Sequence, residues 1–542
     1  MRIGMLAALM GVAITASTAS QSEPLLQLQG QPYSAGSMTL HFIAPVGQPT
    51  LVLYGLDPLD PPLQTPKGPF HIGTVFNAVT LGAIPSLGRI DVPFVVPPLS
   101  PSLAGIPLVM QGYVPGMLTN PTTLPLDQPY YVPADATILV SPNPTPAGLF
   151  SDRVATGDLN GDGSVDVAVS APWENAGGVS QSGRVYVFWG PTLTSSTTLE
   201  PPAPKVTGIF GQGLGIADFD GDATDDLVVT EGTGFPEVTP HGQVHFFQGG
   251  AAFSGIPSFS VDSGGTGTGY SQFGHFLVAA DFDDDGYGDF AAGMPNAPVQ
   301  GFTNAGVIEV FWGPGFAQPL TLVAPQVGTN GFFGERLGTG DLDGDGVPDL
   351  IVGNPRKSVG GQASMGQVHL FTGSTFTHMK TLPHPLPSGV NSRFGNDVVG
   401  PDLNGDGIAE VIATDQRNHA FVFWSPGFDT HLVITRPPDP VSGTAVSISF
   451  GYFATTGDVN GDGLADVTVG EPFAASQGRV YAALGPNFSD FLVLVDKVPE
   501  NSAEFGWGVH VRDVDGDGRA ELLAGSHLGG SSGRLTMFDF DG

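Results

Sequence analysis

The chain has 542 residues, a formal net charge of −34 at pH 7 and no cysteine. This acidic excess disfavours nucleic acid as a partner, because phosphate backbones are bound by basic surfaces, and the lack of cysteine excludes disulfide bonds. The 79 glycines and 49 prolines, with only 13% charged residues, favour a turn-rich all-β protein. Disorder is the competing interpretation, but apolar residues make up 41% of the chain and fall in regular runs.

Residues 1–20 have the features of a secretory signal peptide. Arg2 supplies a positive charge, residues 3–14 form a short apolar run, and small residues before Ala19 suit cleavage. The run is too short to span a bilayer, and no later stretch is apolar enough to do so. We therefore expect a secreted, extracellular protein with a cleaved signal peptide and no transmembrane segment.

Residues 21–134 carry short apolar runs separated by proline and glycine turns. The runs are SMTLHFIA (37–44), TLVLYGL (50–56), GRIDVPFVV (88–96) and GIPLVMQGYV (105–114). They predict the strands of a small β-rich, sandwich-like domain. No chemistry is visible in this region, so we interpret it as a spacer, with a binding role as the alternative.

Residues 135–542 repeat one acidic loop of nine residues seven times, at intervals of roughly 60 residues, which is the mark of a repeat architecture. The copies are DLNGDGSVD (158–166), DFDGDATDD (218–226), DFDDDGYGD (281–289), DLDGDGVPD (341–349), DLNGDGIAE (402–410), DVNGDGLAD (458–466) and DVDGDGRAE (513–521). Six of the repeats open on a Phe-Gly pair, and the first has Phe150-Ser151 instead. The loops contain about half of the 52 acidic residues.

Each repeat predicts four short strands, which is the content of one propeller blade. One strand enters the acidic loop, a second starts on the last acid of the loop, a third is clearest in GRVYVFWG (183–190), and a weaker fourth follows. The seventh repeat ends at its third strand, whereas a strand-like segment precedes the first repeat. We therefore predict a seven-bladed β-propeller over residues 135–542, closed by a strand at 137–140 that pairs in the last blade. An irregular linker is the alternative for that segment.

The loops have the oxygen ligands that Ca²⁺ prefers, six to eight at roughly 2.3–2.6 Å. In a tight loop, positions 1, 3, 5 and 9 can point carboxylate or amide oxygens inward, and the carbonyl of position 7 can add another. Glycine at position 6 permits the sharp turn. Mg²⁺ fits less well because it demands an octahedron and keeps its waters, so we predict up to seven Ca²⁺ ions.

The predicted ligands fall into five sets by loop position. Position 1 comprises Asp158, Asp218, Asp281, Asp341, Asp402, Asp458 and Asp513. Position 3 comprises Asn160, Asp220, Asp283, Asp343, Asn404, Asn460 and Asp515. Position 5 comprises Asp162, Asp222, Asp285, Asp345, Asp406, Asp462 and Asp517. Position 7, through the carbonyl, comprises Ser164, Thr224, Tyr287, Val347, Ile408, Leu464 and Arg519. Position 9 comprises Asp166, Asp226, Asp289, Asp349, Glu410, Asp466 and Glu521.

The second loop departs from the pattern because Ala223 replaces glycine at position 6. A residue with a Cβ in that turn costs about 1 kcal/mol, so we predict that this site is the weakest.

Three other groups of side chains are functional candidates. His245 and His369 occupy equivalent positions on third strands, either as a catalytic pair or as a variable strand position, which we favour. Trp189, Trp312 and Trp424 end third strands and predict aromatic packing between blades, with a sugar-stacking ring as the alternative. Trp173, in a loop between second and third strands, is a candidate for an exposed binding residue.

With these residues in view, residues 135–542 resemble the FG-GAP repeat family, the β-propeller of integrin α-subunit heads and of many exported bacterial proteins. The resemblance rests on the Phe-Gly pairs, the acidic loops and GAP-like tripeptides that end second strands, although the second, fifth and seventh repeats lack the proline. The tripeptides are Ser170-Ala171-Pro172, Gly293-Met294-Pro295, Gly353-Asn354-Pro355 and Gly470-Glu471-Pro472. The resemblance implies Ca²⁺ on the loops between first and second strands and partner binding on the opposite face.

Two functions remain open at this point. The leading hypothesis is a secreted, non-catalytic, monomeric Ca²⁺-binding scaffold that binds an extracellular protein or glycan, as in cell adhesion. The alternative is a secreted carbohydrate-active enzyme, a polysaccharide lyase or hydrolase built on a propeller. The chain contains no G-x-S-x-G, H-E-x-x-H or P-loop motif, and carboxylates that hold Ca²⁺ are poorly placed for acid–base catalysis.

Overall fold

The computed structural model describes residues 136–540 except 233–241, 264–271, 317–318, 387–390, 438–448, 475–476, 499, 501–502 and 531; before residue 136 it describes only the backbone of short strands. The chain divides into two compact units, Met1–Pro129 and Tyr130–Gly542. Within the described residues, no helix has the length and apolar character needed to cross a membrane.

The first unit contains two main sheets. Their strand orders are β2-β3-β1-β8 and β10-β9-β4-β7, with β11 also paired to β9 and β5 paired to β6. The strands are β1 (Ala13–Ser17), β2 (Leu25–Gln29), β3 (Thr39–Ile43), β4 (Pro49–Gly55), β5 (Leu63–Thr65), β6 (Gly68–Phe70), β7 (Val79–Ala83), β8 (Arg89–Val92), β9 (Val109–Val114), β10 (Met117–Leu118) and β11 (Thr122–Thr123). Strand β1 lies inside the segment predicted as a signal peptide, whose other residues lie outside the described ones. The signal peptide and the sandwich stay predictions.

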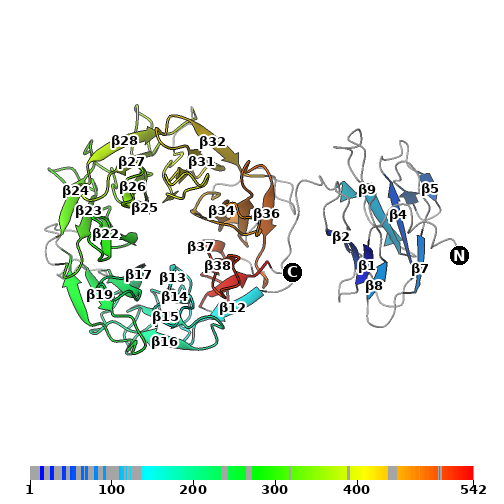
Figure 1. Ribbon diagram of the computed structural model, residues 1–542, viewed down its shortest axis with the longest axis horizontal. Coiled ribbons are helices and arrows are strands. Elements are labelled where there is room, and N and C mark those ends of the chain that lie inside the picture. The colour runs from blue at the N-terminus through cyan, green and yellow to red at the C-terminus, as the bar shows by residue number, and fades with distance from the viewer. Residues whose placement is uncertain are drawn as a thin grey trace. The chain divides into compact units, whose positions relative to one another are not determined.

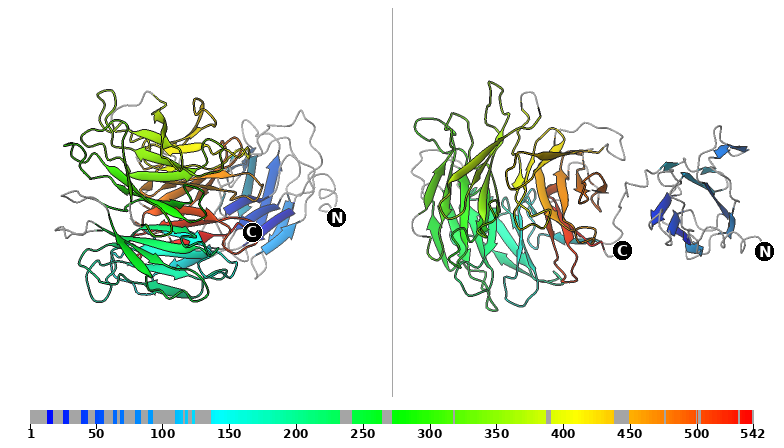
Figure 2. Two further views of the ribbon diagram at one scale, coloured as in Figure 1. Left: turned by 60° about the vertical axis from the view of Figure 1, so that its left-hand side comes forward. Right: turned by 45° about the horizontal axis from the view of Figure 1, so that its top comes forward.

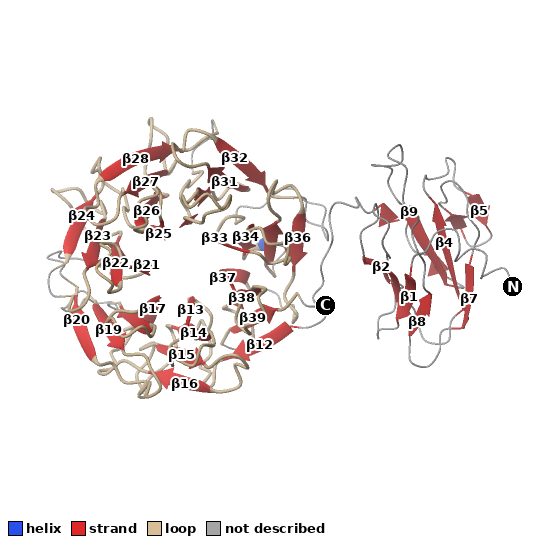
Figure 3. Ribbon diagram, viewed as in Figure 1, coloured by secondary structure: helices blue, strands red, loops and turns tan. Residues whose placement is uncertain are grey.

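The second unit is a propeller of seven four-stranded antiparallel sheets arranged in a ring (Figure 1), which confirms the predicted fold. Each blade runs from an inner strand near the axis to an outer strand at the rim (Figure 3). Because neighbouring strands are antiparallel, loops gather at the two ends of the ring (Figure 2). Connections from first to second and from third to fourth strands lie at one end, which we call the loop face. The other connections form the opposite end, which we call the Phe-Gly face.

The strands of the propeller follow the same order in every blade, from the axis outward. The innermost strands are β13 (Val154–Gly157), β17 (Phe210–Ala217), β21 (Leu277–Ala280), β25 (Arg336–Gly340), β29 (Val398–Val399), β33 (Phe453–Gly457) and β37 (Phe505–Arg512). The second strands are β14 (Asp166–Ala171), β18 (Asp226–Glu231), β22 (Asp289–Met294), β26 (Asp349–Asn354), β30 (Val411–Thr414), β34 (Asp466–Glu471) and β38 (Glu521–Ser526). The third strands are β15 (Arg184–Phe188), β19 (Gln243–Phe247), β23 (Val307–Phe311), β27 (Gln367–Phe371), β31 (His419–Phe423), β35 (Arg479–Ala483) and β39 (Arg534–Phe538). The outer strands are β16 (Ser196–Leu199), β20 (Phe259–Asp262), β24 (Leu320–Val323), β28 (His378–Pro383), β32 (His431–Thr435), β36 (Phe491–Leu494) and β12 (Ala136–Val140).

The ring closes through strand β12, which precedes the first repeat. It pairs with β39 in the last blade, with Ala136 opposite Phe538 and Val140 opposite Arg534. Leu139 of β12 is buried and belongs to a cluster that also contains Phe150 of blade one and Leu535 of blade seven. Closure of this kind removes the sheet edge that an open array would expose.

The core consists of hydrophobic clusters that lie between neighbouring blades. The cluster between blades three and four, for example, packs Phe282 and Ile308 against Leu350 and Phe371. The Phe of every Phe-Gly pair, like Phe150 in the first repeat, is fully buried in such a cluster. The repeat therefore buries its apolar residues only when the next repeat is in place.

The glycine before a third strand lets the next blade approach closely. Gly183 has φ +90°, and a Cβ added to it would lie 2.1 Å from the carbonyl oxygen of Phe210 in blade two. The backbone N–H of Phe210 donates to the carbonyl of Ser182 at 2.9 Å. Only glycine fits between the two backbones at this point.

Candidate metal centres and the opposite face

All seven acidic loops share one set of internal hydrogen bonds. The N–H of position 6 donates to Oδ2 of position 1 at 2.6–3.0 Å. The N–H of position 7 donates to Oδ1 of position 5 at 2.8–2.9 Å. These bonds hold the turn, because aspartate side chains accept from nearby backbone donors in turns. In the first loop, the N–H of Ser164 is the main cause that lowers the pKa of Asp162.

The position-9 acids are buried and hold the blade together as well. In the first blade, one oxygen of Asp166 accepts from the N–H of Leu159 at 3.0 Å, and the other accepts from Gly190 at 2.8 Å. Burial raises the pKa of Asp166 to about 6 and that of Asp289 to about 7, although backbone N–H bonds oppose the shift in each case, from Gly190 and Leu159 to Asp166 and from Gly313 and Phe282 to Asp289. A cation near these carboxylates would favour their ionised form.

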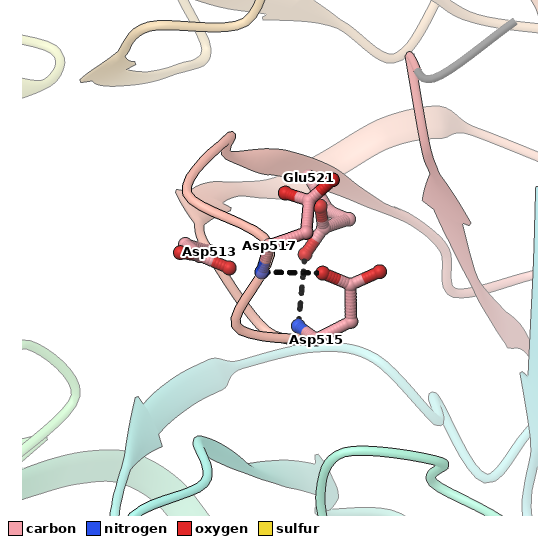
Figure 4. Close-up of side chains that lie close together, drawn as sticks. All are labelled: Asp513, Asp515, Asp517 and Glu521. Carbon is pink, nitrogen blue, oxygen red and sulfur yellow. Dashed lines mark hydrogen bonds between the residues drawn. The ribbon is translucent and has the colours of Figure 1, made fainter.

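Four of the loops bring acidic groups together closely enough for one ion to contact them. The ligand atoms of each group lie within 4.8 Å of one another. The groups are Asp218, Asp220 and Asp222; Asp281, Asp283 and Asp285; Asp341, Asp343 and Asp349; and Asp513, Asp515, Asp517 and Glu521. Figure 4 shows the last group, in which all four side chains surround one end of the loop. The other three loops have Asn at position 3, so fewer acids meet there.

This donor set fits a hard divalent cation. It consists of carboxylate oxygens, which Ca²⁺ and Mg²⁺ prefer. The negative charges also oppose one another: burial first, then the charges of Asp285 and Asp281, raise the pKa of Asp283. A bound cation would remove that repulsion.

The second loop adopts the common conformation despite its alanine. Ala223 has φ +68° and donates its N–H to Oδ2 of Asp218 at 2.7 Å, as glycine does in the other loops. A positive φ is costly for a residue with a Cβ. That the second site is the weakest stays a prediction, which the positive φ of Ala223 supports.

Consecutive loops are linked to each other around the ring. The N–H of Gly288, at position 8 of the third loop, donates to the carbonyl of Asp218 in the second. Asp225, at position 8 of the second loop, accepts from the N–H of Asp158 in the first at 2.9 Å. The sequence pattern assigned no role to position 8, because its partner lies in the neighbouring repeat.

Aromatic residues also join the blades on the loop face. The Trp189 ring meets Phe253 of blade two at 5.2 Å, and Trp312 meets Phe376 of blade four at 5.6 Å. These contacts match the predicted packing between blades. Phe253 and Phe376 belong to turns between third and fourth strands, a repeated position that was not predicted from the sequence. In three other blades the same turn carries a Pro-x-Phe segment, at 314–316, 426–428 and 486–488, which was a signal for this position, although the turns of Phe253 and Phe376 lack the proline.

Near the axis, at the Phe-Gly end of the ring, two arginines stack on one phenylalanine ring. The guanidinium carbons of Arg336 and Arg153 lie 3.8 Å and 4.7 Å from the centroid of Phe276. These residues follow the opening pairs of blades four, one and three. Asp397 of blade five lies nearby, and burial raises its pKa to about 6 although Arg336 opposes the shift. Cation–π contacts thus join blades across the axis.

A partly exposed aromatic cluster lies beside these residues, on blades six and seven. The Trp507 ring contacts Tyr452 at 5.0 Å and Phe473 at 6.4 Å, and Phe473 is 47% exposed. The indole N–H of Trp507 donates to Asp152 at 3.0 Å, and its ring meets His527 edge-on at 4.0 Å. We call Tyr452, Phe473 and Trp507 the aromatic patch. Trp173, 44% exposed, lies on the same face.

The two histidines predicted as an equivalent pair lie in different blades. His245 forms side-chain hydrogen bonds with Glu231 at 3.1 Å and with Ser260 at 2.8 Å, within blade two. His369 is bonded to Thr381 at 3.0 Å, within blade four. Both are buried, so each fills a polar position inside its own sheet and they do not form one site.

A histidine–aspartate group that was not predicted from the sequence lies in blade five. His384 and His419 both bond to Oδ2 of Asp415, at 3.2 and 2.9 Å. Burial alone would raise the pKa of Asp415, but the bonds from His384 and His419 outweigh it and the pKa is lowered. Asp415 also accepts the N–H groups of Arg417 and His419. The carboxylate therefore organises the short turn between β30 and β31.

Comparison with known proteins agrees with this architecture. Four segments match the FG-GAP repeat: residues 150–188, 333–371, 450–482 and 505–536. The chain is 32% identical over 171 residues to rat (Rattus norvegicus) phosphatidylinositol-glycan-specific phospholipase D, covering 29% of this chain and 20% of that protein. It is 29% identical over 220 residues to Xenopus laevis integrin alpha-5, covering 38% and 20%, and 35% identical over 163 residues to mouse (Mus musculus) integrin alpha-IIb, covering 28% and 15%.

The chain therefore carries FG-GAP repeats on an integrin alpha-like β-propeller, as the resemblance implied. Its matches span about a fifth of the length of the first curated relatives. Those relatives include both a named enzyme and integrin alpha subunits, so a catalytic activity is neither assigned nor excluded by them.

Proposed function

We propose that this protein is a secreted, non-catalytic propeller that binds Ca²⁺ through its acidic loops and binds an extracellular protein through its Phe-Gly face. Ca²⁺ suits the loops because their sharp turns supply several oxygens at irregular angles, which Mg²⁺ tolerates poorly. The ions would stabilise the ring, since the chain has no disulfides. Residues 21–134 would serve as a spacer or docking unit.

The aromatic patch is the observation that supports binding of a protein partner. Phe473 is 47% exposed and lies within 5.6 Å of Tyr452, measured between ring centroids. Glu504, beside the patch, pairs with His527 at 2.9 Å. Exposed aromatic rings next to carboxylates suit the basic and apolar side chains of a protein surface.

A binding screen tests this proposal. The full chain, in millimolar Ca²⁺, would be offered to arrays of extracellular proteins and of glycans. A protein ligand should lose about tenfold or more in affinity for Phe473→Ala, as expected of an aromatic anchor. The control is Val323→Ala, which changes a residue 40% exposed on the outer strand of blade three and should bind normally.

Other outcomes would overturn parts of the proposal. Binding to glycans alone would replace the protein partner by a carbohydrate. Equal losses for the two variants would remove the Phe-Gly face from the account. Reproducible turnover of a polysaccharide would favour the alternative of a secreted lyase or hydrolase over a scaffold.

A further inference from the structure

A cavity of about 260 Å³ opens on the loop face between blades two and three. Its lining includes Phe219, Phe246 and Phe259 of blade two and Phe316 of blade three, together with the polar side chains of Gln248 and Asp220. We call it the Phe pocket. It lies at the opposite end of the ring from the aromatic patch. Asp220 and Asp226 in its lining are also predicted ligands of the second acidic loop, but neither the comparisons nor the proposed function gives the cavity itself a ligand.

The other blades show how such a pocket arises. The residue just after the third strand is a tryptophan in blades one, three and five (Trp189, Trp312 and Trp424), and the indoles of Trp189 and Trp312 pack on the turn phenylalanine of the next blade. In blade two the same position is Gln248. Its turn partner, Phe316, stacks instead on Phe246 at 4.3 Å. Space that an indole ring fills elsewhere in the repeat is therefore open to a ligand in blade two.

The walls of the pocket are suited to a flat ring. Phe246 stacks on Phe259 at 4.4 Å with an angle of 10° between the rings. Phe259 is 45% exposed, although most phenylalanines of the propeller are buried. When another ring covers an exposed aromatic surface beside a cavity, the burial of that surface favours binding.

The rim adds hydrogen-bond acceptors. The side-chain N–H of Gln248 donates to Oδ2 of Asp220 at 2.6 Å, which leaves the amide oxygen of Gln248 as an acceptor. The carboxylate of Asp226 also lines the pocket, but both its oxygens already accept backbone N–H groups, from Phe219 and Gly249. An indole N–H or a phenol O–H at the edge of the ring matches the amide oxygen of Gln248, whereas an anionic ligand would meet like charge from Asp220 and Asp226.

We propose that the Phe pocket binds a tryptophan or tyrosine side chain of a protein partner. The volume fits one ring system and is smaller than the usual 300–1,000 Å³ of pockets for larger ligands. A single aromatic anchor in a preformed pocket is a common centre of a protein interface. This surface is separate from the Phe-Gly face, so the protein would have two binding surfaces at opposite ends of the ring.

The experiment measures binding of N-acetyl-tryptophanamide to the full chain by ligand-observed NMR, at fixed millimolar Ca²⁺ so that the second loop stays in one state. We expect saturable binding by the wild type and at least tenfold weaker binding by Gln248→Trp, which places in blade two the residue found in blades one and three. The matched control is Thr372→Trp, at the same repeat position in blade four, and it should bind like the wild type. Phe259→Ala, which removes an exposed wall, should also bind weakly without disturbing the core.

Three results would overturn the proposal. One is the absence of saturable binding by the wild type. Another is an equal loss for Gln248→Trp and Thr372→Trp while both keep the wild-type melting temperature. A third is binding of N-acetyl-leucinamide as tight as that of the tryptophan probe, because the pocket would then not select a ring. Phe473→Ala should leave binding of the probe unchanged, which separates this site from the proposed partner face.

Discussion

The two ends of the propeller differ in how far they repeat. On the loop face, seven loops use the same backbone bonds to aspartates at positions 1 and 5, and the same buried acid at position 9. On the Phe-Gly face, the residue after each opening pair differs from blade to blade: it is Asp152, Gln212, His275, Glu335, Asn396, Tyr452 or Trp507. The hydrophobic clusters between the blades support both faces.

This difference separates the repeated features that stabilise the ring from the variable side chains that can give this protein its own binding specificity. A feature repeated in every blade serves a need that every blade has, such as contact with the next repeat and, in the proposal made above, ion binding. A surface on which each blade has a different side chain can be complementary to only one arrangement of partner groups. The loop face also varies at the residue after the third strand, which is Trp in blades one, three and five and Gln248 in blade two, where the Phe pocket lies.

The largest expected effect is the loss of stability when Ca²⁺ is removed. At a free concentration about 20 times the Kd, a site that binds only the folded state contributes RT ln 21, about 1.8 kcal/mol, and seven such sites contribute on the order of 10 kcal/mol. The melting temperature in millimolar Ca²⁺ should fall by many degrees on addition of a chelator. An unchanged melting temperature would show that the repeated face does not stabilise the ring through metal.

Glycines at the two ends should respond differently to the same substitution. Gly183→Ala places a Cβ 2.1 Å from the carbonyl of Phe210, so the blades must separate, and we expect a loss of several kcal/mol. Gly163→Ala, at position 6 of the first loop, has a similar φ of +86° but nothing within 4 Å, and should cost about 1 kcal/mol. Urea unfolding of both variants in chelator measures the two costs. Similar losses would contradict the close approach of blades at Gly183.

Acid should weaken the junction between blades seven and one. His510 of β37 is bonded to Thr156 of β13 at 2.8 Å, and burial lowers the pKa of His510 to about 4. Because its folded pKa is below the unfolded value of about 6.5, stability is present above pH 6.5 and is lost as the pH falls toward 4. The loss reaches up to about 2 kcal/mol at pH 5 by this linkage.

The matched variant for this effect is His510→Gln, which keeps a hydrogen-bonding group but does not titrate. Its stability relative to the wild type should improve as the pH falls from 7 to 5, as measured by urea unfolding in Ca²⁺-free buffer. A constant difference between the two proteins over this range would rule out protonation of His510 as a cause of acid sensitivity.

A smaller gain is expected from restoring glycine in the second loop. Ala223→Gly removes a Cβ from a turn with φ +68° and should stabilise the metal-free protein by about 0.5–1 kcal/mol. It should also tighten Ca²⁺ binding by the second loop, which is predicted to be the weakest site, and calorimetric titration against the wild type would detect this change. The flexibility of glycine in the unfolded chain opposes the gain, so a loss of stability would mean that Ala223 is not strained.

The smallest effect on stability should come from the surface proposed to bind a partner. Phe473→Ala changes a ring that is 47% exposed, and exposed substitutions usually shift the free energy of unfolding by no more than about 0.5 kcal/mol. Thermal melting in Ca²⁺ measures this shift. A large loss would indicate that Phe473 belongs to the core of blade six and is not a binding residue.

Much of the architecture was visible in the sequence because the chain shows the acidic loop seven times and the Phe-Gly pair six times. The Phe-Gly pairs, the acidic loops and the four-strand plan predicted the propeller, and the aromatic packing of Trp189 and Trp312 was expected as well. The resemblance to FG-GAP repeats was supported by the family comparison.

What the sequence did not reveal depends on partners far away in the chain. Asp152 and Trp507 meet across 355 residues. Asp225 is one of many acids until the structure places it against the backbone of the preceding loop. In the sequence, Gln248 looks like an ordinary surface residue. Only the structure shows that it lines a cavity together with Phe316. Such contacts are set by packing between blades and leave no periodic pattern in the sequence.

The central claim is that the repeated loops are metal sites, and counting bound ions tests it most directly. The purified chain would be dialysed to equilibrium against millimolar Ca²⁺, and the bound metal measured by elemental analysis per mole of protein. The account predicts several ions per chain, up to seven, and about one fewer after Asp513→Asn and Asp517→Asn are combined in the last loop. Less than one ion per chain, or a count that this double substitution does not change, would contradict it.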